Sequence, residues 1–230
     1  MILNRNTILP AAPAAKPVQY ALKALRRDFD RVFTDTAAPG GRILLTINDT
    51  LPAEQYTLTV DADTLLLSAA DDLGFVYGLF EISRRFLGVQ PFWFWNDQPF
   101  EVRESVKILT NTVIESKPAR VTYRGWFIND ETLLSHWKVE RRANLPFVMA
   151  FETLLRLGGN MVIPGTGKNA HIYRQAAADM GLIITHHHAE PLGAEMFAQA
   201  YPDLEPMYSK YPEKFRALWQ ASIDAQKGCA

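Results

Sequence analysis

The feature that most constrains the fold is the stretch from Tyr123 to Glu131, in which an apolar, aromatic run ends abruptly in an amide and two carboxylates. Its letters, YRGWFINDE, are typical of a buried strand that delivers Asn129, Asp130 and Glu131 at its carboxyl end. Parallel barrels present their catalytic groups at that end of their strands. The stretch therefore predicts a parallel α/β sheet with a polar site at one edge.

The residues that follow alternate between strand and helix patterns. We expect strands at 121–128, 160–164 and 182–185, with helices at about 132–157 and 169–180, and a break of the first helix near Leu145-Pro146 as an alternative. Such alternation favours a parallel sheet with right-handed crossovers. The strands are fewer than a complete (β/α)8 barrel needs. We therefore expect residues 118–230 to be the first βα units of a TIM-type barrel, apparently truncated, and the chain to be a fragment.

Residues 1–117 show a different order, α-β-β-β-α-β, which predicts a compact α+β domain. Helices are expected at 17–34 and 72–86, and strands at 43–47, 56–60, 64–68 and 106–112, the middle two forming a hairpin. Gly74 and Gly78 on the second helix would let it approach the sheet closely, because glycine has no side chain.

Four aromatic residues occupy the consecutive positions 92–95, after the second helix. Large aromatic rings dominate buried interfaces, so the favoured interpretation is a plug that packs this domain onto the next. The alternative is one wall of a sugar site, in which Trp95 would contact the substrate.

Composition and charge exclude several classes of partner. A formal net charge of -1 over 230 residues gives no basic footprint, so we expect neither nucleic acid nor a membrane as partner.

The one cysteine, Cys229, cannot form a disulfide within the chain. The N-terminus lacks a continuous apolar segment, so we expect no signal peptide and a cytoplasmic location, or a secreted or periplasmic one if a leader was removed. The oligomeric state stays open, with a homo-oligomer as one alternative.

Three strand ends are expected to supply a polar site. Asn129, Asp130 and Glu131 follow the first strand, Thr166 the second, and His186, His187, His188 and Glu190 the third. Parallel strands about 4.8 Å apart put groups on strands one and three on the order of 10 Å apart. Inverting glycosidases separate their carboxyls by about 6.5–9.5 Å, so Glu131 and Glu190 are compatible with such a pair. Equally open is a structural alternative, in which Asp130 caps the next helix and Glu131 is a first-turn charge.

The consecutive histidines also raise the question of a metal. His186 and His188 would share one face of the strand, with Glu190 near. No metal-ligand spacing such as H-E-x-x-H occurs. We therefore expect a hydrogen-bonding wall of a polar pocket and no metal, with metal binding as the less favoured alternative.

Several motifs occur in a specific order: DDLGFVYGLFEIS at 71–83, LGV at 87–89 before the aromatic run, RGWFINDE at 124–131, LLRLGGN at 154–160 and HHAEPL at 187–192. Together they resemble glycoside hydrolase family 115, the xylan α-1,2-glucuronidases. The first motif is similar to that family's N-terminal domain, which is like the domain before the barrel in β-hexosaminidases. The last resembles a His-His-Glu-Pro-Met segment, with Ala189 standing between the histidines and Glu190.

The resemblance implies an inverting hydrolase that removes (4-O-methyl)glucuronic acid from glucuronoxylan or a related oligosaccharide, without a cofactor. It implies a hexosaminidase-like domain at 1–117 and the start of the barrel at 118–230. Glu131 and Glu190 would be the acid/base groups. The substrate would be bound by Asn129, Asp130, Trp95, Thr166, His187 and His188. The alternative function is a non-catalytic carbohydrate-binding or assembly module, or an inactive fragment of the hydrolase.

Overall fold

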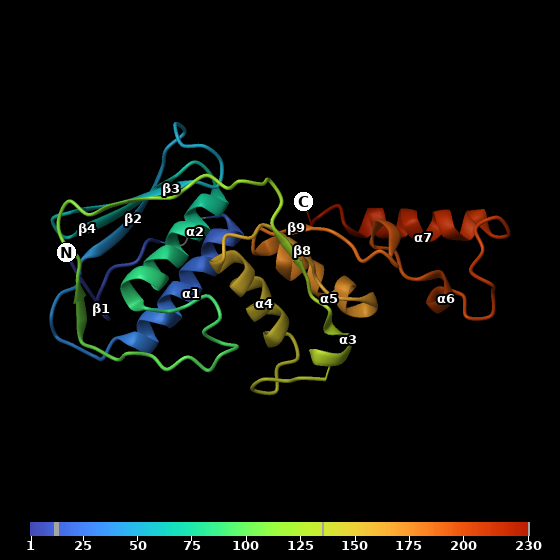
Figure 1. Cartoon of the computed structure of the whole chain (residues 1–230), viewed down its shortest axis with the longest axis horizontal. Helices are drawn as coiled ribbons and strands as arrows, with labels where there is room; N and C mark the ends of the chain where they lie inside the picture. Colours follow the sequence, from blue (N-terminus) through green and yellow to red (C-terminus); the bar gives the residue numbers. More distant parts are fainter. Residues whose placement is uncertain (12–13, 135, 230) are drawn as a thin grey trace. The chain divides into compact units, whose positions relative to one another are not determined.

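The computed structural model describes residues 1–11, 14–134 and 136–229, which divide into two compact units (Figure 1). Unit 1 comprises Met1–Thr122 and Leu155–Gly158, and unit 2 comprises Tyr123–Leu154 and Gly159–Ala230. Both units combine helices with a sheet, so the predicted mixed α/β class is confirmed. Among the described residues, no helix is both long enough and apolar enough to cross a membrane.

Unit 1 is built on a four-stranded sheet in the order β2-β4-β3-β6. The strands are β2 (Arg42–Ile47), β3 (Tyr56–Asp61), β4 (Thr64–Ala69) and β6 (Val113–Glu115). Strand β2 runs parallel to β4, whereas β3 is antiparallel to both β4 and β6. The predicted strand at 43–47 and the predicted hairpin are confirmed, because their alternation and turn residues are local signals.

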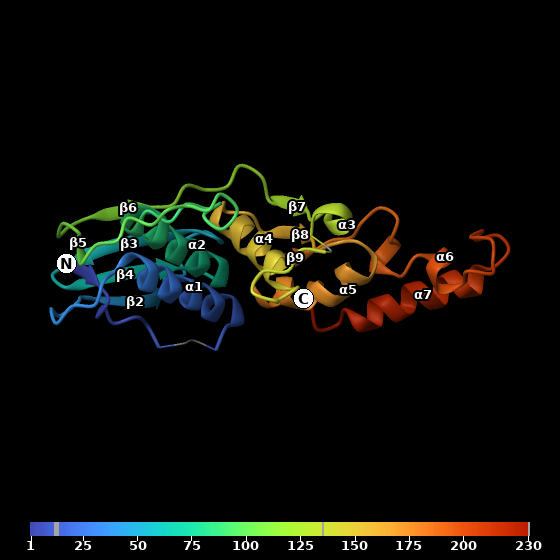
Figure 2. The same cartoon turned by 90° about the horizontal axis from the view of Figure 1, so that it is seen from below.

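Two helices, α1 (Lys16–Val32) and α2 (Asp72–Ile82), lie side by side on one face of this sheet (Figure 1 and Figure 2). Helix α2 continues into the π-helical turn η1 (Ser83–Leu87). An added Cβ at Gly74 would lie 2.6 Å from the carbonyl oxygen of Gln55, and one at Gly78 would collide with Leu67. The two glycines therefore permit the close approach of α2 to the sheet that the sequence predicted.

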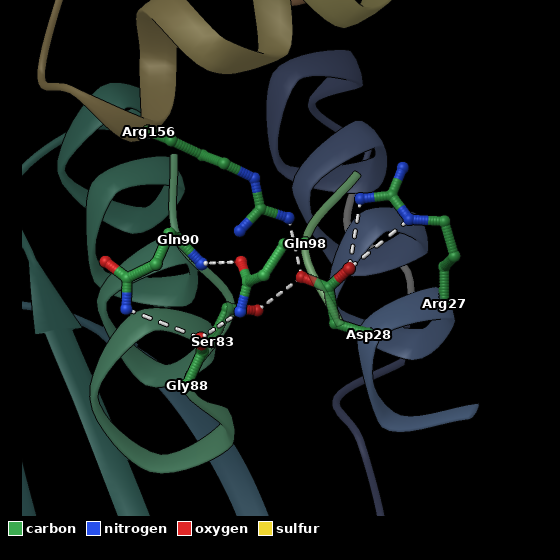
Figure 3. A network of polar contacts seen from close by, with 7 residues as sticks. All are labelled: Arg27, Asp28, Ser83, Gly88, Gln90, Gln98 and Arg156. Atoms are coloured by element: carbon green, nitrogen blue, oxygen red, sulfur yellow. Dashed lines mark hydrogen bonds and ion pairs between the residues drawn. The ribbon is translucent and has the colours of Figure 1, made fainter. Parts of the chain in front are cut away.

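A buried polar network joins α1 and η1 to the end of α4 within unit 1 (Figure 3). The Asp28 side chain is 0% exposed and pairs with Arg156, whose side chain is 2% exposed. Ser83 Oγ donates to Asp28 Oδ2 at 2.7 Å, and Arg27 approaches Oδ1 at 3.0 Å. The Arg156 guanidinium also lies 4.5 Å from the centre of the Phe80 ring. A buried carboxylate is thus matched by charge-assisted hydrogen bonds.

The predicted strand at 106–112 is confirmed only at its first two residues and is wrong over 108–112. The structure has two short strands there, β5 (Ser105–Lys107) and β6, separated by a turn in which Asn111 takes a φ of 66°. Strand β5 pairs antiparallel with β1 (Ile2–Asn4), which the sequence pattern did not indicate. This pairing joins segments far apart in the chain, so no local periodicity reveals it.

Trp93, in the aromatic run at 92–95, packs against α1 within unit 1. The Trp93 side chain is 5% exposed, and the guanidinium groups of Arg27 and Arg31 lie 4.6 and 4.3 Å from its ring centre. Cations over an aromatic face are attracted by the ring quadrupole. Burial of Trp93 therefore stabilises unit 1 itself, and the proposed plug between domains stays a prediction.

Unit 2 is built on three parallel strands in the order β7-β8-β9. They are β7 (Gly125–Phe127), β8 (Met161–Ile163) and β9 (Ile183–Ile184), which confirms the three predicted strands. The expected burial of the first is wrong, since Phe127 is 38% exposed. The reason is that β7 is an edge strand of this sheet, with β8 as its neighbour.

The helical segments of unit 2 are α3 (Asp130–Leu133), α4 (Leu145–Arg156), α5 (Gly167–Asp179), η2 (Pro191–Gly193), α6 (Phe197–Ala200) and α7 (Pro212–Ala225), with the last two residues of α4 belonging to unit 1. The predicted helix at 132–157 is wrong over its first half. Glu140 and Arg141 have φ values of 52° and 63°, which no right-handed helix accommodates. Helix α5 ends before Gly181 (φ 93°), as predicted.

Candidate functional site

The candidate site is built around the β8–α5 loop, by which we mean residues 164–166 together with Gly167, the first residue of α5. This loop follows the carboxyl end of β8, and β8 lies between β7 and β9. Gly165 and Gly167 have φ values of 138° and 51°, where a side chain would be strained, and Thr166 between them is the N-cap residue of α5. Residues that follow β7 and β9 reach this loop from its two sides.

Asp130 reaches the loop from β7 and is 1% exposed. Its Oδ1 accepts the Thr166 N–H at 2.7 Å and the Thr166 hydroxyl at 2.9 Å, while its Oδ2 accepts the side-chain amide of Asn169. A negative charge at the start of α5 is also favoured by the helix dipole. The alternative in which Asp130 caps its own helix is wrong, because the N-cap residue of α3 is Asn129. Asp130 instead fixes the β8–α5 loop.

Glu190 reaches the same loop from β9 and is also 1% exposed. Its Oε1 accepts the N–H of Gly167, the residue after Thr166. Asp130 and Glu190 therefore bind adjacent N–H groups. Since consecutive residues are about 3.8 Å apart, the two bonded carboxylate oxygens lie within about 9 Å of each other.

Glu131 differs from both of these carboxylates because it is exposed. It lies in the first turn of α3, directly after Asp130. The structural alternative placed Glu131 as a charge in the first turn of a helix, and that is where it lies. The helix itself has only four residues. The site thus contains two buried carboxylates bound to the loop and one that is open to solvent.

The histidines that follow β9 contact the end of β7. The His187 ring stacks on Phe127 at 5.0 Å between ring centres, and His188 lies 4.1 Å from His187. His187 is half-buried and His188 is exposed. In the described parts of the chain, no group of three or more His, Cys, Asp or Glu side chains is arranged to hold a metal ion.

The structure therefore gathers the predicted unit 2 residues at one sheet edge, with Asn129 exposed beside Asp130. Trp95 belongs to unit 1, where its ring meets Phe94 edge-on at 5.1 Å. Sequence reasoning missed Asn169 and the N–H of Gly167. The signal was present in the Gly-Thr-Gly turn before a helix, since a helix N-terminus offers N–H groups to anions.

His186 precedes Glu190 by four residues and is half-buried. Burial lowers its pKa below the ordinary value, and the positive charge of Arg174 lowers it further, while Glu190 acts in the opposite direction. On α5, burial raises the pKa of Tyr173, and the negative charge of Asp130 adds to that rise. The neutral form of His186 is therefore favoured in the folded protein.

Acidification is expected to weaken unit 2 through His186. Because the folded pKa lies below the unfolded value of 6.5, the unfolded chain takes up the proton first, so this contribution to stability is complete above pH 6.5 and is lost as the pH falls below it. Urea unfolding at pH 7 and pH 5 should show a smaller loss for His186→Asn than for wild type. His136 is exposed, so His136→Asn should lose as much free energy of unfolding between pH 7 and pH 5 as wild type does. An equal loss in all three proteins would contradict the expectation.

Comparison with known proteins gives the family of the chain and its fold. A family model described as glycosyl hydrolase family 115 covers residues 116–230, half of the chain. The search for similar curated proteins finds none. A solved family GH115 4-O-methyl-α-glucuronidase with specificity for decorated arabinogalactans aligns with a TM-score of 0.73 and 23% identity, over 96% of this chain and 34% of its own.

Two further solved structures are less similar. A β-N-acetylhexosaminidase from Bacteroides fragilis aligns with a TM-score of 0.53 and 15% identity, over 95% of this chain and 50% of its own. A family 20 β-N-acetylglucosaminidase aligns with a TM-score of 0.54 and 18% identity, over 94% of this chain and 45% of its own. These likenesses show the fold, and the chain spans about a third of the length of the family GH115 structure. By the family match, which includes all three parallel strands and the β8–α5 loop, the chain belongs to glycosyl hydrolase family 115.

Proposed function

We propose that the protein is a glycoside hydrolase that releases (4-O-methyl)glucuronic acid side groups from a polysaccharide such as glucuronoxylan. Family membership supports the reaction class. The similar solved glucuronidase supports the release of a uronic acid from a polysaccharide. Its specificity for decorated arabinogalactans adds a second polymer to test. The observation that carries the proposal is the grouping of Asp130, Glu131 and Glu190 around one loop at the strand ends.

We propose further that unit 2 forms the first βα units of a (β/α)8 barrel and that unit 1 is a hexosaminidase-like domain. The parallel strands follow one another in chain order, with helices α4 and α5 between them, as successive barrel units do. The likeness to hexosaminidase structures supports the assignment of unit 1.

In this proposal Glu131 and Glu190 form the acid/base pair. During inversion one carboxylic acid protonates the leaving glycosidic oxygen, while the other carboxylate takes a proton from the attacking water, which forms the new bond at the anomeric carbon. Asp130 holds the loop through Thr166. Sugar hydroxyls form hydrogen bonds with the side chains of His187, His188 and the exposed Asn129 in this proposal.

The test is uronic acid release by the full-length protein, incubated with oligomers of glucuronoxylan and of glucuronic acid-decorated arabinogalactan. Chromatography should show release from at least one, and proton NMR should show the inverted anomer first. Glu131→Gln should lower the rate about 10²-fold or more, since acid/base groups contribute roughly 10²–10⁴-fold. No release from either polymer, with wild type and Glu131→Gln alike, would sink the assignment.

One observation favours a carbohydrate-binding module instead: Asp130 and Glu190 are both buried and bound to the loop. Such a module would bind the same oligomers without cleaving them. Calorimetric titration on the same samples separates the two functions, because binding without release supports the module and release supports the hydrolase.

A further inference from the structure

We infer that Ser222 on α7 and Gln226, the C-cap residue of α7, are positioning residues, which hold the turn that carries Glu190 against the β8–α5 loop. The kinetic consequence of this inference rests on the proposed function, because it assumes that Glu190 takes part in catalysis. The structural consequence, a turn held from α7, does not depend on that assumption.

The turn after Glu190 has an unusual backbone. Leu192 has φ 59° and ψ 19°, a left-handed conformation inside the short helix η2, and Gly193 follows with φ 69°. A non-glycine residue keeps this conformation only where its surroundings impose it. The Gly193 N–H donates to the carbonyl oxygen of Glu190 at 2.8 Å, so the backbone of Glu190 is part of the turn.

Helix α7 supplies the contacts that impose this conformation. The carbonyl oxygen of Leu192 accepts the Ser222 hydroxyl at 3.0 Å and the Gln226 side-chain amide at 2.9 Å. The same amide donates to Ser222 Oγ at 2.9 Å, and Ser222 is 7% exposed. The Leu192 side chain is 50% exposed, so the turn is held by its carbonyl more than by apolar packing.

The backbone of the turn is also enclosed on its other side. An added Cβ at Gly193 would lie 2.6 Å from the His186 ring and 3.1 Å from Gln226 Nε2. Gly193 therefore sits between the end of β9 and the end of α7. A displaced Gln226 side chain would therefore disturb Gly193 and, through it, His186, which lie after and before Glu190 in the chain.

Removal of the two donors should let Leu192 relax toward an ordinary backbone conformation. Glu190 lies two residues earlier and holds the Gly167 N–H through Oε1, so its carboxylate would lose its fixed place. Neither Ser222 nor Gln226 needs to touch the sugar for this effect. The expected signature is a fall in kcat with little change in KM, which distinguishes positioning from substrate binding.

The experiment compares Ser222→Ala, Gln226→Met and the double variant in the full-length protein. A misplacement of about 1 Å costs roughly 10²-fold in rate, so kcat of the double variant should fall by about that factor, with KM changed less than threefold. Ser222→Thr keeps the hydroxyl and should restore most of the rate. Gln220→Ala, on the same helix but bonded to Asp224, should behave as wild type.

Amide hydrogen exchange over residues 186–193 gives a readout independent of activity. Exchange should be faster in Gln226→Met, a substitution of the half-buried C-cap residue of α7, and unchanged in Gln220→Ala. If Glu190→Gln is inactive but the double variant keeps the wild-type kcat, the inference is overturned and the proposed function stands. If Glu190→Gln is fully active, the proposed role of Glu190 fails, and exchange alone decides whether α7 holds the turn.

Discussion

Glu190→Gln in the full-length protein is expected to lower kcat for uronic acid release by about 10²–10⁴-fold, the contribution of a general acid or base. Glutamine cannot donate or accept that proton at neutral pH. Its carbonyl oxygen can still accept the Gly167 N–H, so the loop and the fold should be retained. Initial rates on the better oligomer, with circular dichroism as a check of folding, measure the effect.

Glu195→Gln provides the matched control, because Glu195 is exposed and follows the same turn. It should keep the wild-type rate. A Glu190→Gln protein that retains more than about a third of the wild-type kcat would show that Glu190 only anchors the loop. The catalytic pair would then have to be sought elsewhere, with Glu131 as the remaining open carboxylate of this edge.

Local signals in the sequence predicted much of the fold. The hairpin of β3 and β4 and the three parallel strands follow from alternation, apolar runs and turn residues, which depend on near neighbours in the chain. The errors have a different origin. Strand β5 forms because β1 pairs with it, and the helix expected from residue 132 fails where Glu140 and Arg141 turn left-handed.

In the candidate site, too, the features set by near neighbours in the chain could be predicted, and those set by distant contacts could not. The carboxyl ends of neighbouring parallel strands share one edge of the sheet, so the sequence could predict that Asp130, Thr166 and Glu190 lie together. The sequence could not show that both carboxylates bind adjacent N–H groups of the same loop, because that depends on side-chain rotamers and on two glycines with positive φ. No pattern links Gln226 to Leu192, since their contact depends on how α7 folds back.

Breaking the Asp28–Arg156 pair should have the largest effect on stability. Removal of one partner from a buried ion pair costs about 3–5 kcal/mol, because it leaves the other charge buried without compensation. Asp28→Asn should lower the free energy of unfolding of unit 1 by this amount, since Arg156 is 2% exposed and cannot turn to water. Urea unfolding of the chain, followed by circular dichroism, measures the change.

The exposed pair of Arg42 and Asp63 is the matched control, with side chains 51% and 64% exposed. Asp63→Asn should change the free energy of unfolding by less than about 1 kcal/mol, as surface ion pairs do. Asp28→Asn and Arg156→Met should each be costly alone, yet their double variant should cost less than the sum, because neither charge is then left unpaired. Additive losses would mean that the two side chains act separately. In that case the ion pair would not be what joins the end of α4 to α1 in unit 1.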